Sequence, residues 1–170
     1  RYGNVFGSRG SVYNVFKNFE QKGFLPITDK EMTRFNITIE EGVNLVIKSL
    51  NDAIGSEIIV PKLRSFKITD LAKAMNPKNK IKIIGIRSGE KIHEQMISKS
   101  DSHYTLETKN FYIILPPKIL DEENFNIVLN YYKKKFNAKK VKFNFEYSSD
   151  NNGKNLSIKE LLAHINNIKN

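Results

Sequence analysis

Apolar residues recur every three or four positions in several stretches of the chain, the spacing that predicts amphipathic helices. The first stretch runs over residues 12–19, with Ser11 placed as its N-cap and Gly23 just past its end. Further helices are expected over residues 39–50, 68–75, 125–132 and 158–168.

The second and last of these stretches each begin with a capping box, formed by Thr38 with Glu41 and by Ser157 with Glu160. We expect the apolar face of each helix to be its buried stripe. In the second stretch this face consists of Ile39, Val43, Val46, Ile47 and Leu50. In the last it consists of Ile158, Leu161, Leu162, Ile165 and Ile168.

Short β-branched or aromatic runs between the helices predict strands. They cover residues 25–29, 57–60, 80–86 and 111–115, and residues 143–147 form either a half-buried strand or an extended strap. The run over 80–86 has the profile of a buried strand, with isoleucine at 81, 83, 84 and 86. Because helices alternate with strands, the predicted fold class is α/β.

The chain is organised around residues 80–96, which read as strand, loop and helix, with Ile92 and Met96 resuming at helical spacing. The loop holds Arg87 and Glu90 on either side of Gly89. A guanidinium suits a pair of phosphate oxygens, and a carboxylate suits the two hydroxyls of a ribose. The loop therefore suggests a site for a nucleoside diphosphate. The alternative is a surface ion pair between the two side chains beside a turn.

The glycine-rich amino-terminal segment offers a second set of candidate ligands. Ser8, Arg9 and Ser11 can donate to an anion, as can the amide of Asn4. They precede the first predicted helix, and a helix amino terminus favours anions. The alternative is a plain capped connection. Arg34 precedes the second helix, at a position from which it can point into the same cleft as Arg87. The alternative for Arg34 is a structural or solvated arginine.

Length and composition restrict the class of protein. The chain has 170 residues, enough for one ordinary domain or a piece of a larger protein, and no apolar run has the length of a membrane span. It contains no cysteine, which excludes disulfides and thiolate chemistry. Its three histidines have no ligand spacing, so we expect no metal site. Because it begins at Arg1, in what resembles a strand end, we expect a fragment.

The formal net charge of +10 raises the question of nucleic-acid binding. The densest cluster, over residues 133–142, lacks the aromatic stacking pattern of nucleic-acid modules, which favours a solvated lysine face. Arginine is rare in this lysine-rich chain. It occurs at positions 1, 9, 34, 64 and 87, and all but Arg64 fall within the motif stretches.

Three motifs follow one another along the chain. They are Arg1-Tyr2-Gly3-Asn4-Val5 with Ser8-Arg9-Gly10-Ser11-Val12, then Thr28-Asp29 with Met32-Thr33-Arg34-Phe35, then Ile86-Arg87-Ser88-Gly89-Glu90-Lys91-Ile92-His93-Glu94. Together they resemble the C-terminal half of the nucleotide-sugar 4,6-dehydratases of bacterial polysaccharide and flagellin-glycan pathways. These enzymes belong to the extended short-chain dehydrogenase/reductase superfamily. The nearest resemblance is to UDP-N-acetylglucosamine 4,6-dehydratases of the 5-inverting type, which act toward pseudaminic acid.

The resemblance covers residues 1–170 and implies late Rossmann strands with a small α/β substrate-binding domain, the N-terminal NADP-binding half being absent. It implies UDP-sugar contacts by Asn4, Ser8, Arg9, Gly10, Ser11 and Val12. It also implies that Arg34 and Arg87 hold the diphosphate or neighbouring groups, that Glu90 holds the ribose, and that Tyr2 contacts the cofactor. The chain departs from the family pattern at Phe6-Gly7, Asn36 and Ser88, where Met-Ala, an aromatic residue and proline are usual. None of these departures removes a proposed contact.

A redox enzyme of this kind needs a glycine-rich dinucleotide loop, a Tyr-x-x-x-Lys pair and a Thr-Asp-Lys set, and this chain has none of them in context. We therefore expect no catalytic residue here. The resemblance implies the UDP-sugar-binding portion of an NADP-dependent enzyme that oxidises C4, removes water across C5 and C6, and reduces C6. It further implies a cytoplasmic homo-oligomer that binds neither nucleic acid nor membrane.

Two alternatives remain open at this point. One is a UDP-N-acetylhexosamine 4-epimerase of the same superfamily, whose C-terminal UDP-sugar-binding part would resemble this chain. The other is a stand-alone module that binds nucleotide-sugars or, on charge alone, nucleic acid.

Overall fold

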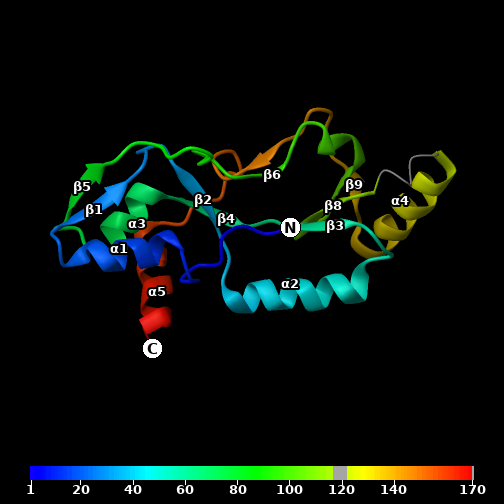
Figure 1. Cartoon of the computed structure of the whole chain (residues 1–170). Coiled ribbons are helices and arrows are strands. Elements are labelled where there is room, and N and C mark those ends of the chain that lie inside the picture. Colours follow the sequence, from blue (N-terminus) through cyan, green and yellow to red (C-terminus); the bar gives the residue numbers. More distant parts are fainter. Residues whose placement is uncertain (117–121, 170) are drawn as a thin grey trace. The chain divides into compact units, whose positions relative to one another are not determined.

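The computed structural model describes residues 1–116 and 122–169, and the chain divides into two compact units (Figure 1). Unit 1 comprises Arg1–Tyr2, Glu40–Lys62 and Gln95–Tyr147, and unit 2 comprises Gly3–Ile39, Leu63–Glu94 and Ser148–Asn170. Each unit is assembled from separate stretches of the sequence. Residues far apart in the chain therefore meet within each unit.

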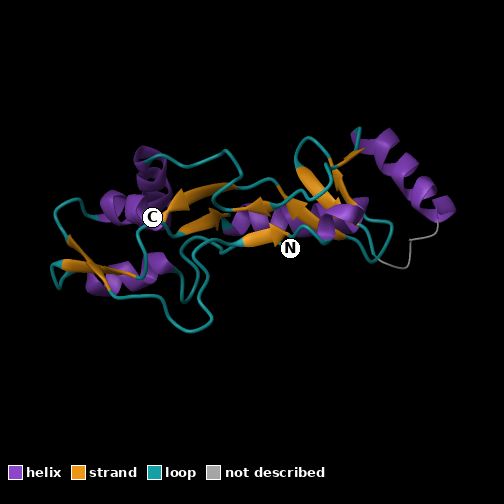
Figure 2. Ribbon diagram, turned by 90° about the horizontal axis from the view of Figure 1, so that it is seen from above, coloured by secondary structure: helices purple, strands orange, loops and turns teal. Residues whose placement is uncertain are grey.

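The described residues of unit 1 form a four-stranded antiparallel sheet, whose strands are among those drawn in orange in Figure 2. Its order is β3 (Ile58–Pro61), β8 (Phe111–Ile114), β7 (Thr105–Glu107) and β9 (Lys139–Lys140). The registers set Ile59 and Leu106 beside Ile113, in the centre of the core. Helix α4 (Glu122–Phe136) adds Val128 and Tyr132 to that core. A short 3-10 helix, η1 (Asp101–Tyr104), precedes β7.

Unit 2 contains three helices and two strand pairs in its described part. Helix α1 (Val12–Glu20) is followed by β1 (Phe24–Ile27), which pairs in parallel with β5 (Lys80–Ile83). Strand β2 (Thr33–Asn36) pairs antiparallel with β4 (Arg64–Lys67), which leads into α3 (Ile68–Met75). Helix α5 (Ile158–Lys169) completes the described part of unit 2. A short strand pair, β6 (Gln95–Ile97) with β10 (Tyr147–Ser148), consists of unit 1 residues apart from Ser148.

The core of unit 2 joins α1, β1, α3 and α5. Its fully buried side chains include Phe16, Leu25, Leu71 and Leu161, one from each of these elements. This packing fixes α1 and β1 relative to α3, and the loops that follow or precede these elements are fixed with them.

The structure confirms most of the predicted elements. The helix over 68–75 has the predicted bounds, and α1 begins after Ser11 as expected. The capping box at α5 is present, because Glu160 N lies 3.3 Å from Ser157 Oγ and Ser157 N donates to Glu160 Oε2 at 2.9 Å. The predicted stripe of α5 is only partly buried. Leu161 and Ile165 are buried, whereas Ile158, Leu162 and Ile168 are exposed.

The predicted burial of the second helix is wrong. Helix α2 (Ile39–Asp52) forms as expected, but Ile39, Val43, Val46, Ile47 and Leu50 are all about half exposed or more. The side of α2 that contacts unit 1 instead carries Gly42, which is buried, and Leu45, which packs against the core. Periodicity identified the apolar face of this helix correctly. It could not say whether the chain itself covers that face.

Three further predictions need correction. The strand β5 forms, but all four of its residues are exposed because it is an edge strand with β1 as its paired neighbour. Met96 lies in strand β6, so the helix expected at Ile92–Met96 is absent from the described residues. The amino-terminal strand end reduces to one bridge, between Val5 and Ile37. Of the strand or strap expected over residues 143–147, Phe143 lies exposed in a turn, whereas Tyr147 is buried and begins the short strand β10.

Candidate functional site

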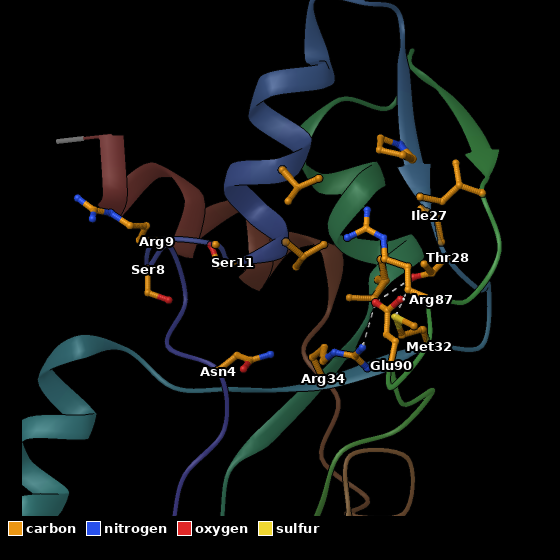
Figure 3. Close-up of a pocket in the computed structure, with 16 residues that line it drawn as sticks. Asn4, Ser8, Arg9, Ser11, Ile27, Thr28, Met32, Arg34, Arg87 and Glu90 are labelled. Carbon is orange, nitrogen blue, oxygen red and sulfur yellow. Dashed lines mark hydrogen bonds and ion pairs between the residues drawn. The ribbon is translucent and has the colours of Figure 1, made fainter.

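A cavity of about 340 Å³ lies in unit 2, where the loop before α1 meets β1, β2, the start of α3 and the loop after β5. Figure 3 shows the side chains that line it. All nine residues predicted to contact the substrate line this cavity: Asn4, Ser8, Arg9, Gly10, Ser11, Val12, Arg34, Arg87 and Glu90. They come from three segments separated by more than twenty residues of sequence, and the core of unit 2 brings them together.

The loop before α1 is held in a fixed shape. Gly7 and Gly10 both have a positive φ, of 78° and 81°, which other residues rarely adopt. Asn14, on the first turn of α1, donates through Nδ2 to the carbonyl oxygens of Gly7 (3.2 Å) and Ser8 (2.8 Å). Sequence reasoning did not single out Asn14, because its spacing alone did not distinguish it from a solvent-exposed position.

Ser11 occupies the N-cap position of α1, but its side chain makes no capping hydrogen bond. Among the described residues its buried Oγ has no hydrogen-bond partner, although the residue lines the cavity. A buried hydroxyl without a partner is unfavourable. The hydroxyl of Ser11 therefore has unused hydrogen-bonding capacity beside the cavity, at the amino terminus of α1.

Arg34 is largely fixed by the protein itself. Its Nη1 donates to the carbonyl oxygens of Thr33 at 2.7 Å and Ile92 at 3.0 Å. Its Nη2 lies 3.8 Å from Glu90 Oε1, as marked in Figure 3, and its Nε lies 4.0 Å from Glu94 Oε1. The side chain is only 13% exposed. The guanidinium thus connects strand β2 to the loop at Ile92 and lies beside two carboxylates at the wall of the cavity.

Glu90 and Arg87 do not form the surface ion pair that was the alternative interpretation. The carboxylate of Glu90 instead accepts from Thr28 Oγ1 at 3.4 Å and from the backbone N–H of Arg87 at 3.4 Å. Its ion pair is with Arg34. Within the part of the chain that the structure describes, the guanidinium of Arg87 has no hydrogen-bond or ion-pair partner. It is therefore a cation available to a ligand.

A polar network lies behind Arg34. Glu94 Oε2 accepts from Phe35 N at 2.8 Å, and Glu94 N donates to Ser149 Oγ at 2.9 Å. Ser149 Oγ is 2.6 Å from Thr33 Oγ1, which is 2.8 Å from His93 Nδ1. Burial raises the pKa of Glu94, opposed in part by the Phe35 N–H and by Arg34. These contacts join residues from distant parts of the sequence, so periodicity gave no signal for them.

Tyr2, the predicted cofactor contact, is not among the residues of this cavity. It belongs to unit 1, where it is about half exposed and lines a separate, mainly apolar cavity of about 590 Å³ with residues of α2 and β3.

The described residues contain no cluster of three or more potential metal ligands. None of the helices in the described ranges is long and apolar enough to cross a membrane.

The fold and the cavity define an α/β protein with an anion-favouring site, in which three arginines and a helix amino terminus surround one polar pocket. Comparison with known proteins then identifies the group. Residues 1–116 match the family described as "Polysaccharide biosynthesis protein", so the chain belongs to that family.

Individual relatives agree with this assignment. The chain is 52% identical, over 98% of its length, to a UDP-N-acetylglucosamine 4,6-dehydratase (inverting) of Campylobacter jejuni, and covers 50% of that protein. It is 36% identical to a UDP-glucose 4-epimerase of Rickettsia canadensis, over 99% of this chain and 50% of the relative. It also resembles the X-ray structure of Pen from Bacillus thuringiensis, with a TM-score of 0.77, 31% identity, and coverage of 99% of this chain and 49% of that one.

The chain thus spans about half the length of the curated relatives it matches. The predicted resemblance to the inverting UDP-N-acetylglucosamine 4,6-dehydratases is confirmed. The predicted fold class is confirmed as well: a mixed α/β structure that matches half of a longer chain.

Proposed function

We propose that the cavity of unit 2 binds the nucleotide part of a UDP-N-acetylhexosamine, as the substrate-binding portion of a UDP-N-acetylglucosamine 4,6-dehydratase. The observation that carries the proposal is the convergence of all nine predicted ligand residues on one cavity. Its volume, about 340 Å³, lies within the range of small-molecule sites, at its lower end.

The roles of the charged residues follow from their partners. Arg87 and Arg9 present guanidinium groups with no ion-pair partner among the described residues, and both line the cavity. They suit the two phosphates, which carry negative charge and accept bidentate hydrogen bonds. Arg34 is already bound to two carbonyl oxygens and lies beside two carboxylates. Its main role is therefore to position Glu90.

Glu90 is the candidate ligand for the ribose hydroxyls. Its carboxylate lies at the cavity wall and is held by Thr28 Oγ1 and by Arg87 N through contacts of 3.4 Å, which are long for hydrogen bonds. A carboxylate accepts from both hydroxyls of a ribose. The neighbouring loop before α1 contributes further polar groups, among them the hydroxyl of Ser11, which has no hydrogen-bond partner among the described residues.

The complete enzyme that we propose removes hydrogen from C4 of the sugar, eliminates water across C5 and C6, and reduces C6. NADP, when bound, supplies the oxidation and the reduction. The one residue of this chain expected to touch it, Tyr2, is exposed but does not by itself make a cofactor site. This chain contributes substrate binding and orientation, and we assign it no proton or hydride transfer. The cytoplasmic location and homo-oligomeric assembly belong to the same proposal.

Calorimetry on the 170-residue chain tests the binding part of this proposal. UDP and UDP-N-acetylglucosamine should bind, and Arg9→Ala should weaken both. Lys17→Ala is the matched control, because Lys17 is an exposed cation of α1 that does not line the cavity. Equal losses in the two variants would indicate a general charge effect and would count against the site.

The reaction class is tested by supplying the other half of the protein and analysing the product by mass spectrometry. A dehydratase yields a product lighter by one water, whereas a 4-epimerase yields an isomer of unchanged mass. The higher identity to the dehydratase, 52% against 36%, favours the first result. Binding of a single-stranded oligonucleotide that weakens steeply with salt, without UDP binding, would instead support the nucleic-acid alternative.

A further inference from the structure

The loop before α1 is anchored at both of its ends. Phe6, at its start, is buried in the core of unit 2, and Ser11, at its end, is the N-cap residue of α1. Of residues 7–10 between these anchors, all but Gly7 line the cavity, and Figure 3 shows the side chains that this loop presents. The shape of these four residues therefore decides where a large part of the cavity wall lies.

The glycines of the loop permit this shape but do not impose it. Gly7 and Gly10 have φ values of 78° and 81°, and glycine adopts positive and negative φ about equally well. A Cβ atom placed on Gly10 would meet no atom within 4 Å beyond its chain neighbours, so packing does not restrict the loop at that position. Another contact must select the observed conformation.

Asn14 provides that contact from the first turn of α1. Its Nδ2 donates to Gly7 O at 3.2 Å and to Ser8 O at 2.8 Å, which uses both protons of the amide group. Ser8 O also accepts from Ser11 N at 2.9 Å, so both of its lone pairs are occupied. The helix that carries Asn14 is itself fixed, because Phe16 of α1 is fully buried in the core.

We infer that Asn14 is a positioning residue of the UDP-sugar site, which holds residues 7–10 in the conformation that meets the diphosphate. This inference rests on the proposed function. Asn14 does not line the cavity, so it acts through the loop and not by touching the ligand. Without its two hydrogen bonds the loop samples other conformations, and the apparent affinity falls with the fraction that remains competent to bind. Two hydrogen bonds of ordinary strength correspond to a loss of about 10-fold.

Calorimetry with UDP on the 170-residue chain and its Asn14→Ala variant tests this inference. Asn18→Ala is the matched control, since Asn18 is exposed one turn further along α1 and does not line the cavity. Alanine favours a helix, so α1 should persist in both variants, and their melting temperatures verify this. Binding of uridine, followed by an NMR titration, reports on the part of the site that does not hold phosphate.

We expect Asn14→Ala to weaken UDP binding by about 10-fold and to leave uridine binding unchanged. Asn18→Ala should change neither. Asn14→Asp gives a second test, because an ionised carboxylate keeps the shape of the side chain but cannot donate. An acidic group near a helix amino terminus favours the helix, so this variant should stay folded and still bind UDP more weakly than Asn18→Asp does.

The possible failures are distinguishable. If the wild-type chain does not bind UDP, the proposed function is overturned, and the role of Asn14 in the site with it. If the wild type binds UDP and Asn14→Ala binds it equally well, only the inference about Asn14 is overturned. Equal weakening of UDP and uridine binding would also overturn it, since this would indicate a general loss of structure.

Discussion

Replacing Arg87 by alanine isolates the binding contribution of one guanidinium. The side chain makes no hydrogen bond or ion pair to any other described residue, and the contact that holds Glu90 comes from the backbone N–H of Arg87, which alanine keeps. The stability of the fold should therefore change little. A charge-assisted, bidentate bond to phosphate contributes roughly 1.5–3 kcal/mol. At about 1.4 kcal/mol per tenfold, Arg87→Ala should weaken UDP-sugar binding by about one to two orders of magnitude.

Calorimetry with UDP-N-acetylglucosamine, performed on the complete enzyme, measures this loss. Arg87→Lys should recover only part of it, because an ammonium group cannot form the paired hydrogen bonds of a guanidinium. Lys78→Ala is the control for net charge, since Lys78 is exposed in the same unit and does not line the cavity. Unchanged affinity of Arg87→Ala, with unchanged melting, would remove the diphosphate site from this loop.

The same measurement on Glu90→Gln separates the ribose from the phosphates. The amide keeps an acceptor for Thr28 but gives up the charge that faces Arg34 at 3.8 Å. We expect a smaller loss of affinity than for Arg87→Ala. The loss should be larger for UDP than for its 2′-deoxy analogue, and equal losses for the two nucleotides would contradict the assignment of Glu90 to the ribose.

Four further predictions concern activity and stability. The purified 170-residue chain should form no 4-keto-6-deoxy product from UDP-N-acetylglucosamine, because it lacks a hydride carrier, and detection of that product would contradict this. Leu161→Ala should lower the free energy of unfolding by about 2–5 kcal/mol in a denaturant titration, whereas exposed Leu162→Ala should cost far less. Hydrogen bonds from Arg64 and Ser157 lower the pKa of Glu160 to about 2. The ionised Glu160 side chain should therefore stabilise the fold fully above pH 4.5, its ordinary pKa, and this stabilisation should vanish as the pH falls toward 2. Glu160→Gln should remove this pH dependence from the melting temperature. Burial raises the pKa of Glu94, so wild type should lose stability relative to Glu94→Gln as the pH rises from 4.5 through that pKa.

Local patterns were sufficient for much of the fold. Ser157 and Glu160 predicted the start of α5 through a capping box that depends only on neighbours in sequence, and the structure contains it. The bounds of α3 followed from its apolar spacing and from Asn76-Pro77 at its end. These interactions involve residues only a few positions apart, within one or two helical turns. The sequence alone therefore specifies them.

Burial was predicted less well, because it depends on what covers a surface. The stripe of α5 illustrates this, since Leu161 is buried by α3 and its neighbours while adjacent Leu162 is exposed. Strand β5 has the composition of a buried strand, yet it lies at the edge of a two-stranded sheet with every residue exposed.

The identity of the site residues was easier to predict than their partners. Arg34, Arg87 and Glu90 were all expected at one cleft, and all three line one cavity. Their roles differ because of contacts across long sequence separations, such as Thr28 with Glu90 and Arg34 with the carbonyl of Ile92. These contacts occupy Arg34 and leave Arg87 available. If the site binds a diphosphate, alanine at 34 should therefore change both stability and affinity, whereas alanine at 87 should change affinity alone, a distinction that the sequence motif by itself does not make.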